Sequence, residues 1–231
     1  MLIDKISVFF PAYNEAENIE STVFKALEFL PKIAASFEVI VVDDGSSDQT
    51  AKIVEKIVAS NKNVRLIKHS RNLGYGAALK TGLYSSRFPL IAFTDADGQF
   101  NINQLVKFLP KIKYCDLVVG YRIKRADKFI RILNAKAWGF LIRVLFGLRV
   151  KDIDCGFKLI KKDVIEKISR LESDGALVSA ELLVQAKKAG FKICEVGIDH
   201  FPRKKGQQTG ANVRVIAKAF IELFKLYTKL K

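Results

Sequence analysis

Short runs of β-branched and aromatic residues alternate with amphipathic segments over the first 120 residues of the chain. The β-type runs ISVFF, FEVIVVD, VRLIKH, LIAFTD and DLVVGY predict strands at 6–10, 37–43, 64–69, 90–95 and 116–121. Between them, Ile, Val, Leu and Ala recur with helical spacing, which predicts helices over 16–30, 48–60, 76–87 and 102–113. This alternation predicts an α/β fold with a mostly parallel central sheet and helices on both faces.

Polar clusters follow the first four predicted strands: PAYNE, DDGSSD, SRNLGYG and DADGQ. In a parallel sheet, ligands bind beyond the carboxyl ends of the strands, so we expect the clusters to converge on one edge. Ordinary turn chemistry accounts for part of DDGSSD, since Ser47 or Asp48 can cap a helix and Gly45 can form the turn. Asp43 and Asp44 are left without such a role. GYGAALKTG matches the dinucleotide-binding fingerprint incompletely and in the wrong βα unit, which argues against a nicotinamide cofactor.

Asp95 and Asp97 stand two residues apart at the end of a predicted strand. Glycoside hydrolysis requires two carboxyl groups on opposite sides of the scissile bond, about 5 to 9 Å apart. Adjacent loop positions suit a shared cation better, because Mg²⁺ and Mn²⁺ take one or two carboxylates from a protein and further oxygens from phosphates and water. Gln99 adds an amide oxygen. The loop therefore predicts a Mg²⁺ or Mn²⁺ site for a nucleotide diphosphate.

Length and composition favour one domain over residues 1–231, because 231 residues with 49% hydrophobic content can bury a full core. Lys and Arg interrupt the most apolar region, 129–148, which falls short of the roughly 18 apolar residues of a membrane span. The N-terminus shows no cleavage signature, so we expect a cytoplasmic protein. Cys115, Cys155 and Cys194 lie far apart without a C-x-x-C pair, so reduced, buried thiols are expected.

Charge divides the chain into two unlike halves. Residues 1–120 carry 14 basic and 13 acidic residues, whereas residues 121–231 carry 25 and 11. The basic half predicts contact with phosphates, on a nucleic acid or on an anionic membrane; a solvated basic surface is the alternative. Because this half shows no helix-turn-helix or aromatic RNA-binding pattern, we do not expect nucleic acid as a partner.

Seven segments occur in an order that resembles inverting glycosyltransferases of family 2, in particular the dolichyl- or polyprenyl-phosphate sugar synthases. They are FFPAYNEAENI, VIVVDDGSSDQT, RNLGYGAALKTG, FTDADGQF, VVGYR, DCGFKLIKK and SAELLVQAKKAGFKICEVGIDHFPRKKGQQTG. Together they run from about residue 6 to about residue 225. The resemblance implies a GT-A-type fold, with a nucleotide-sugar half over 1–120 and an acceptor half, near a membrane, over 121–231.

The resemblance also implies roles for individual residues in a metal-dependent transfer of a hexose from a UDP- or GDP-linked donor. By it, Asp43 accepts a hydrogen bond from the base, and Asp95, Asp97 and Gln99 bind the metal and the diphosphate. It further implies a base and ribose pocket lined by Pro11, Ala12, Tyr13 and Glu15.

A polyprenyl or dolichyl phosphate acceptor is already ionised near neutral pH, so the site needs cations and no general base. Arg122, Arg131 and Arg203 are the candidates, because arginine makes forked contacts with phosphate oxygens. An acceptor hydroxyl on a glycan or small molecule is the alternative; relatives of that kind carry an E-D pair late in the domain, which this chain lacks. The roles of Glu181 and His200 stay open.

Two amphipathic segments lie in the basic half, at 128–149 and over the last 20 residues. The first predicts a helix in the membrane interface, with a helix packed on the sheet as the alternative. For the second, a membrane contact, a homodimer contact and a cover for the core remain open. We expect peripheral attachment to the cytoplasmic face of an anionic membrane, with each basic residue contributing about 1 kcal/mol.

Overall fold

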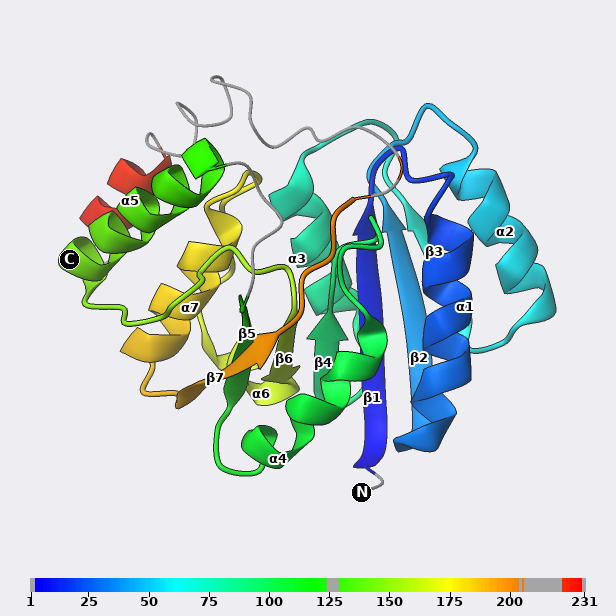
Figure 1. Ribbon diagram of the computed structural model, residues 1–231, viewed down its shortest axis with the longest axis horizontal. Helices are drawn as coiled ribbons and strands as arrows, with labels where there is room; N and C mark the ends of the chain where they lie inside the picture. Colours follow the sequence, from blue (N-terminus) through cyan, green and yellow to red (C-terminus); the bar gives the residue numbers. More distant parts are fainter. Residues whose placement is uncertain (1–2, 124–128, 204, 206–221, 230–231) are drawn as a thin grey trace.

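Seven strands form one sheet in the computed structural model, which describes residues 3–123, 129–203, 205 and 222–229, without the side chains of 129–136. The strand order is β3-β2-β1-β4-β6-β5-β7 (Figure 1). The strands are β1 Ile3–Ala12, β2 Ala34–Asp43, β3 Val64–Lys68, β4 Leu90–Phe93, β5 Leu117–Arg122, β6 Lys158–Lys161 and β7 Ile193–Ile198. All pairs are parallel except those of β6 with β4 and β5. The predicted α/β class and mostly parallel sheet are confirmed.

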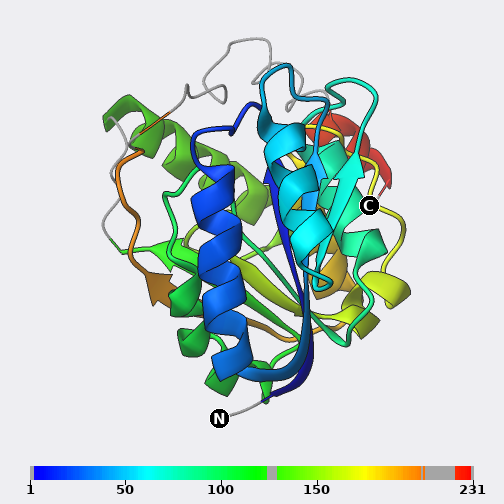
Figure 2. The same ribbon diagram turned by 90° about the vertical axis from the view of Figure 1, so that its right-hand side faces the viewer.

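The helices lie in two groups that cover opposite faces of the sheet. They are α1 Ile19–Phe29, α2 Thr50–Ser60, α3 Tyr75–Ser85, α4 Leu109–Ile112, α5 Phe129–Phe146, α6 Lys162–Lys167 and α7 Val178–Lys188, with 3₁₀ turns at Leu30–Lys32 and Ile102–Lys107. Residues 222–229 are also helical. Figure 2 shows α1 and α2 side by side in front of the sheet.

Successive side chains of β1 point to opposite faces of the sheet, and each face has its own apolar core. Val8 and Phe10 pack with α1, α2 and α4, whereas Phe9 points to the other face and packs with α3, α5, α6 and α7. Leu223 and Leu226 join this second core. The helical segment 222–229 therefore covers this second core. A cover for the core was one of the three roles that the sequence left open for the last 20 residues.

The register of the parallel strands brings their carboxyl ends to one edge. Ala12 at the end of β1 is paired with Asp43 at the end of β2, and Phe9 is paired with Phe93 at the end of β4. Asp43 is also paired with Lys68 of β3. The four polar clusters thus follow the strands at the same edge of the sheet, as predicted from the sequence.

The cysteine prediction was wrong for two of the three residues. Cys115, just before β5, and Cys194 of β7 form a disulfide, with their Cα atoms 6.0 Å apart. Their distance of 79 positions in the sequence hid the contact, which arises only because β5 and β7 are neighbours in the sheet. Cys155 is a buried free thiol, and burial raises its pKa to about 12.

Candidate functional site

Asp95 and Asp97 lie on the loop that follows β4, which we call the acidic loop. The Tyr75 hydroxyl donates to Asp95 Oδ1 at 3.1 Å, and the Gln99 backbone N–H donates to Asp97 Oδ1 at 3.0 Å. Gly156 faces the other side of Asp95, and a Cβ built on it would lie 2.2 Å from Asp95 Oδ2. The Asp95 carboxylate is thus held between a phenol and a backbone that has no side chain.

The two carboxylates influence each other electrostatically. Burial, followed by the negative charge of Asp97, raises the pKa of Asp95 to about 6, while Tyr75, Lys158 and Arg122 act in the opposite direction. A carboxylate whose ionisation is disfavoured by a neighbouring negative charge suits a bound cation, which would relieve the repulsion. No cluster of three or more His, Cys, Asp or Glu residues that could hold a metal occurs in the described part of the chain. Two carboxylates completed by substrate phosphate oxygens are in keeping with that.

Arg203 reaches the acidic loop from the segment after β7. Its Nη1 lies 3.6 Å from Asp97 Oδ2, and its Nη2 donates to Glu15 Oε1 at 2.6 Å. Gln99 contributes its side-chain amide to the same segment, because Nε2 donates to the Phe201 carbonyl at 3.1 Å. The fold therefore brings Asp97, Gln99, Glu15 and Arg203 together, although they come from three distant parts of the sequence.

Arg122 lies at the end of β5 and makes a forked contact with Asp152. Its Nε and Nη2 donate to the two Asp152 carboxylate oxygens at 2.6 and 2.7 Å, and both side chains are 9% exposed. Its positive charge also acts on Asp95. Arg131 belongs to α5, but its side chain lies outside the described residues. A phosphate-binding role for either arginine stays a prediction.

The predicted base and ribose pocket lies where β1 and β2 end. Pro11, Ala12 and Asp43 are buried, and Tyr13 is 36% exposed. The Ser46 backbone N–H donates to Asp43 Oδ1 at 3.3 Å. These residues are adjacent in the fold, and their contact with a nucleotide stays a prediction.

Asp44 has a clear structural task that the sequence left open. Its carboxylate accepts from the backbone N–H groups of Leu73 and Gly74 at 3.0 and 2.8 Å, and its Oδ1 lies 2.7 Å from His69 Nδ1. Asp44 therefore holds the loop between β3 and α3 in place. This loop leads directly into α3, whose first residue is Tyr75.

Sequence reasoning missed the partners of the acidic loop. Tyr75 and Gly156 touch Asp95, Asp152 holds Arg122, and Lys158 lies fully buried nearby. The sequence signals were the lysine and the glycine of DCGFKLIKK, and neither indicates which acidic residue it contacts.

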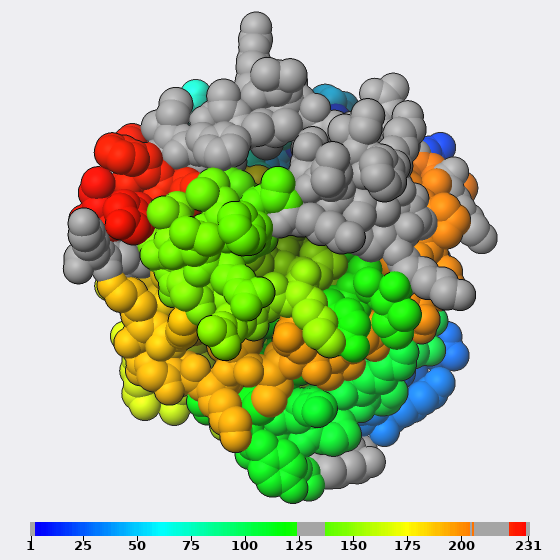
Figure 3. Space-filling view, turned by 60° about the vertical axis from the view of Figure 1, so that its left-hand side comes forward, coloured from blue at the N-terminus to red at the C-terminus, as the bar shows by residue number. Residues whose placement is uncertain are grey.

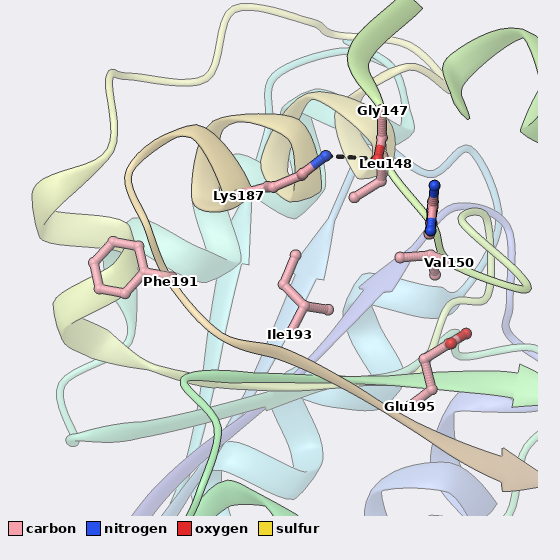
Figure 4. A pocket seen from close by; sticks show the side chains of 8 residues that line it. Gly147, Leu148, Val150, Lys187, Phe191, Ile193 and Glu195 are labelled. Carbon is pink, nitrogen blue, oxygen red and sulfur yellow. Dashed lines mark hydrogen bonds between the residues drawn. The ribbon is translucent and has the colours of Figure 1, made fainter. Parts of the chain in front are cut away.

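A separate hollow of about 470 Å³ opens beside β7 and the end of α5 (Figure 4). Leu148, Val150, Phe191 and Ile193 give it an apolar lining, while Lys187 donates to the Gly147 carbonyl at 2.5 Å. It contains none of the predicted site residues. The acidic loop is the candidate functional site, because the strand ends and the charged side chains converge there.

Comparison with known proteins identifies the family of the chain. The family description "Glycosyl transferase family 2" matches residues 7–169, which include the acidic loop. A dolichyl-phosphate beta-glucosyltransferase of Dictyostelium discoideum is 32% identical over 214 residues, covering 84% of this chain and 65% of the relative. Glycosyltransferase AglD of Haloferax volcanii is 30% identical, covering 86% and 33%. The chain thus spans between a third and about two thirds of the length of these relatives.

Solved structures share the fold at lower identity. Glucosyl-3-phosphoglycerate synthase from Mycobacterium tuberculosis, solved with Mn²⁺, UDP and phosphoglyceric acid, superposes with a TM-score of 0.71 at 19% identity, covering 96% of this chain and 78% of that one. Its complex with UDP alone gives 0.70 at 20% identity, covering 97% and 80%. The fold is therefore of the GT-A type, and the chain belongs to glycosyl transferase family 2.

Proposed function

We propose that this chain transfers a hexose, with inversion, from a nucleotide-diphospho-sugar to a polyprenyl or dolichyl phosphate, using Mg²⁺ or Mn²⁺. The observation that carries the proposal is the Asp95–Asp97 loop at the carboxyl edge of a family 2 sheet. Relatives that cover most of the chain are named dolichyl-phosphate beta-glucosyltransferases, which supports glucose and a lipid phosphate as substrates. Solved neighbours with UDP and Mn²⁺ support a uridine donor.

The residues divide into a donor side and an acceptor side. Asp95 and Asp97 would hold the metal, with Gln99 beside them, and the bound cation would neutralise the leaving diphosphate. Asp43 would bind the base from the end of β2. Arg122, Arg131 and Arg203 would hold the acceptor phosphate, whose ionised oxygen attacks the anomeric carbon from the face opposite the leaving group.

Calorimetric titration with UDP and with GDP, each with Mn²⁺ and with chelator, tests the donor side. We expect UDP to bind in the presence of Mn²⁺ and to lose most of its affinity with chelator. Binding of neither nucleotide would contradict the transferase assignment. Transfer from UDP-glucose to dolichyl phosphate, compared with transfer to a free sugar hydroxyl, tests the acceptor; preference for the hydroxyl would support the alternative acceptor class.

The acceptor is a lipid, so we also propose that the protein docks peripherally on the cytoplasmic face of an anionic membrane. None of the helices in the described ranges is both long and apolar enough to cross a bilayer. Figure 3 shows α5 and residues 222–229 next to each other on the surface. Phe140 and Val144 of α5 are 69% and 63% exposed, and Phe224 is 69% exposed. Arg143 and Lys225, next to Val144 and Phe224 in the sequence, are also exposed. Exposed aromatic and basic side chains on paired helices suit a lipid interface.

Flotation with vesicles that contain anionic lipid tests this docking. We expect salt-sensitive binding by the native protein and loss of binding when Phe140→Ser and Phe224→Ser are combined. Phe24→Ser is the matched control, because Phe24 is 51% exposed on α1, away from this surface. Absence of vesicle binding would remove the proposal, and a dimer that dissociates in the double variant would assign the surface to a second copy instead.

A further inference from the structure

Glu15 and Arg203 form a short ion pair beside the acidic loop. Arg203 Nη2 donates to Glu15 Oε1 at 2.6 Å, and the two side chains are only 12% and 9% exposed. The other carboxylate oxygen of Glu15 accepts from Asn18 Nδ2 at 2.8 Å. Both oxygens of Glu15 are therefore engaged by protein donors. Burial raises the pKa of this carboxyl above its ordinary value, and the contacts with Asn18 and Arg203 offset part of that rise.

The Arg203 guanidinium is held by several acceptors from different parts of the chain. Besides Glu15, its Nη1 faces Asp97 Oδ2 at 3.6 Å, and its Nε donates to the Lys205 carbonyl at 2.8 Å. Arginine presents its donors in a rigid fork, so contacts on three sides fix the plane of the group. Glu15 supplies the shorter of the two carboxylate contacts.

The segment that carries Arg203 is fastened to the site without help from Glu15. The Phe201 backbone N–H donates to the Gln99 carbonyl at 2.9 Å, and Gln99 Nε2 returns a bond to the Phe201 carbonyl. Gln104 makes two further bonds with the Asp199 backbone, at 2.8 and 3.0 Å. Loss of Glu15 would therefore remove the shorter carboxylate contact of the guanidinium and leave the backbone in place.

We infer that Glu15 is a positioning residue that holds Arg203 at the acidic loop for the acceptor phosphate. The inference rests on the proposed function. It gives Glu15 a role on the acceptor side, whereas the family resemblance implied a place in the base and ribose pocket. Arg203 and Asn18 each take an acceptor site on one of the two oxygens of Glu15, so a ribose would have to share this carboxylate with both of them.

The substitution Glu15→Gln tests the inference, because it keeps the shape of the side chain and removes its charge. We expect the KM for dolichyl phosphate to rise at least about tenfold, which corresponds to the loss of one charge-assisted contact. The UDP affinity with Mn²⁺ should stay within about twofold, since the contact lies on the acceptor side. Glu17→Gln is the matched control, because Glu17 is exposed two residues further along the chain and its substitution should change neither quantity.

The second test measures whether the effect of Glu15→Gln on the acceptor KM depends on Arg203. Arg203→Gln should raise the acceptor KM by itself, and Glu15→Gln should add almost nothing in that background. Loss of UDP affinity in Glu15→Gln with an unchanged acceptor KM would overturn the inference and return Glu15 to the nucleotide pocket. Independent, additive effects of the two substitutions would also overturn it.

A double-mutant cycle on stability separates this inference from the proposed function. If the native protein neither binds UDP with Mn²⁺ nor transfers sugar, the proposed function fails. The urea midpoints of the single and double variants still report whether Glu15 holds Arg203. Shifts that are not additive support the positioning contact, and additive shifts contradict it.

Discussion

Gly156 leaves the space that the Asp95 carboxylate fills. A Cβ at this position would lie 2.2 Å from Oδ2, far closer than two non-bonded atoms allow, so Gly156→Ala should push the carboxylate out of place. We expect Mn²⁺-dependent UDP binding to weaken at least about tenfold, measured by calorimetry, with an unchanged circular dichroism spectrum. Gly139→Ala is the control, because no atom of another described residue is recorded within 4 Å of a Cβ at Gly139. Equal affinities in both variants would contradict the predicted metal site.

Lys158 is the buried cation behind the acidic loop. It is 0% exposed, and its Nζ donates to the carbonyls of Cys155 at 2.6 Å and Ile153 at 3.2 Å. Burial lowers its pKa, and neighbouring carboxylates oppose that shift. Lys158→Met would leave these buried carbonyls without their donor, so we expect a loss of about 1–3 kcal/mol in the free energy of unfolding. Urea denaturation measures this loss.

A matched control for that prediction lies on α7. Lys188 is exposed, so Lys188→Met should change the free energy of unfolding by less than about 0.5 kcal/mol. If both methionine variants were equally stable, the carbonyl contacts of Lys158 would carry no net stabilisation.

The positions of some residues of the candidate site could be predicted from the pattern of strands alone. Asp43, Asp95 and Asp97 follow hydrophobic runs, and parallel strands bring such ends together whatever the loops do. Their partners were not predictable, because the contacts of Asp152 with Arg122 and of Gly156 with Asp95 depend on how a later segment returns to the sheet. Charge and residue type alone do not indicate that return.

At the scale of elements, Asp116 joins three strands at the edge of the sheet opposite to the site. Its Oδ2 accepts from the Lys192 backbone N–H at 2.9 Å, just before β7, and its Oδ1 accepts from Lys161 Nζ of β6 at 3.0 Å. The Lys192 N–H, followed by Lys161, lowers the pKa of Asp116 below its ordinary value of about 3.9. The carboxylate therefore stabilises the fold while it is ionised.

Asp116→Asn should lower the free energy of unfolding by about 1 kcal/mol at neutral pH. The unfolded protein binds a proton at Asp116 more tightly than the folded protein does, so the stabilisation is complete above about pH 4 and disappears as pH falls through the lower folded pKa. Urea denaturation of both proteins between about pH 3 and pH 7 measures the difference. A difference that stays constant over this range would mean that the charge is not responsible.

The helices and strands agree with the predicted ones where the hydrophobic periodicity of the sequence is strong. The predicted strands at 6–10, 37–43 and 64–69 correspond to β1, β2 and β3, although β1 and β2 are longer than predicted. The predicted helix over 102–113 is a 3₁₀ turn followed by the short α4, because Pro110 in the first turn of α4 has no N–H to continue a preceding helix.

The strands β6 and β7 were not predicted as part of the sheet. β6 has four residues and a lysine at each end, and β7 has a half-buried edge pattern, so neither shows clear alternation or a long apolar run. The insertion of β6 between β4 and β5 as an antiparallel strand is a tertiary feature. Local propensity carries little information about such a pairing.

At the scale of the whole molecule, the unequal charge of the two halves gives the proposed donor site and the proposed membrane contact different electrostatic surroundings. Residues 121–231 have 25 basic and 11 acidic residues, whereas residues 1–120 are nearly neutral. Exposed charges act on an anionic surface over about a Debye length, which shortens from about 10 Å at 0.1 M salt to about 3 Å at 1 M. In the proposed function, the acidic loop and Asp43 would act on a bound nucleotide at direct contact, where salt screens much less.

We therefore expect salt to affect the two activities differently. Between about 0.1 M and 1 M NaCl, transfer to dolichyl phosphate in anionic vesicles should fall at least tenfold, because the basic half loses its attraction to the surface. Mn²⁺-dependent UDP binding, measured by calorimetry in the same buffers, should change only about twofold, because its contacts are short and partly buried. Transfer to a short, water-soluble polyprenyl phosphate is the control, since it requires no vesicle and should keep most of its rate. Parallel loss of transfer with both acceptors would place the salt sensitivity in the arginine site for the phosphate, and the membrane would then have no separate role.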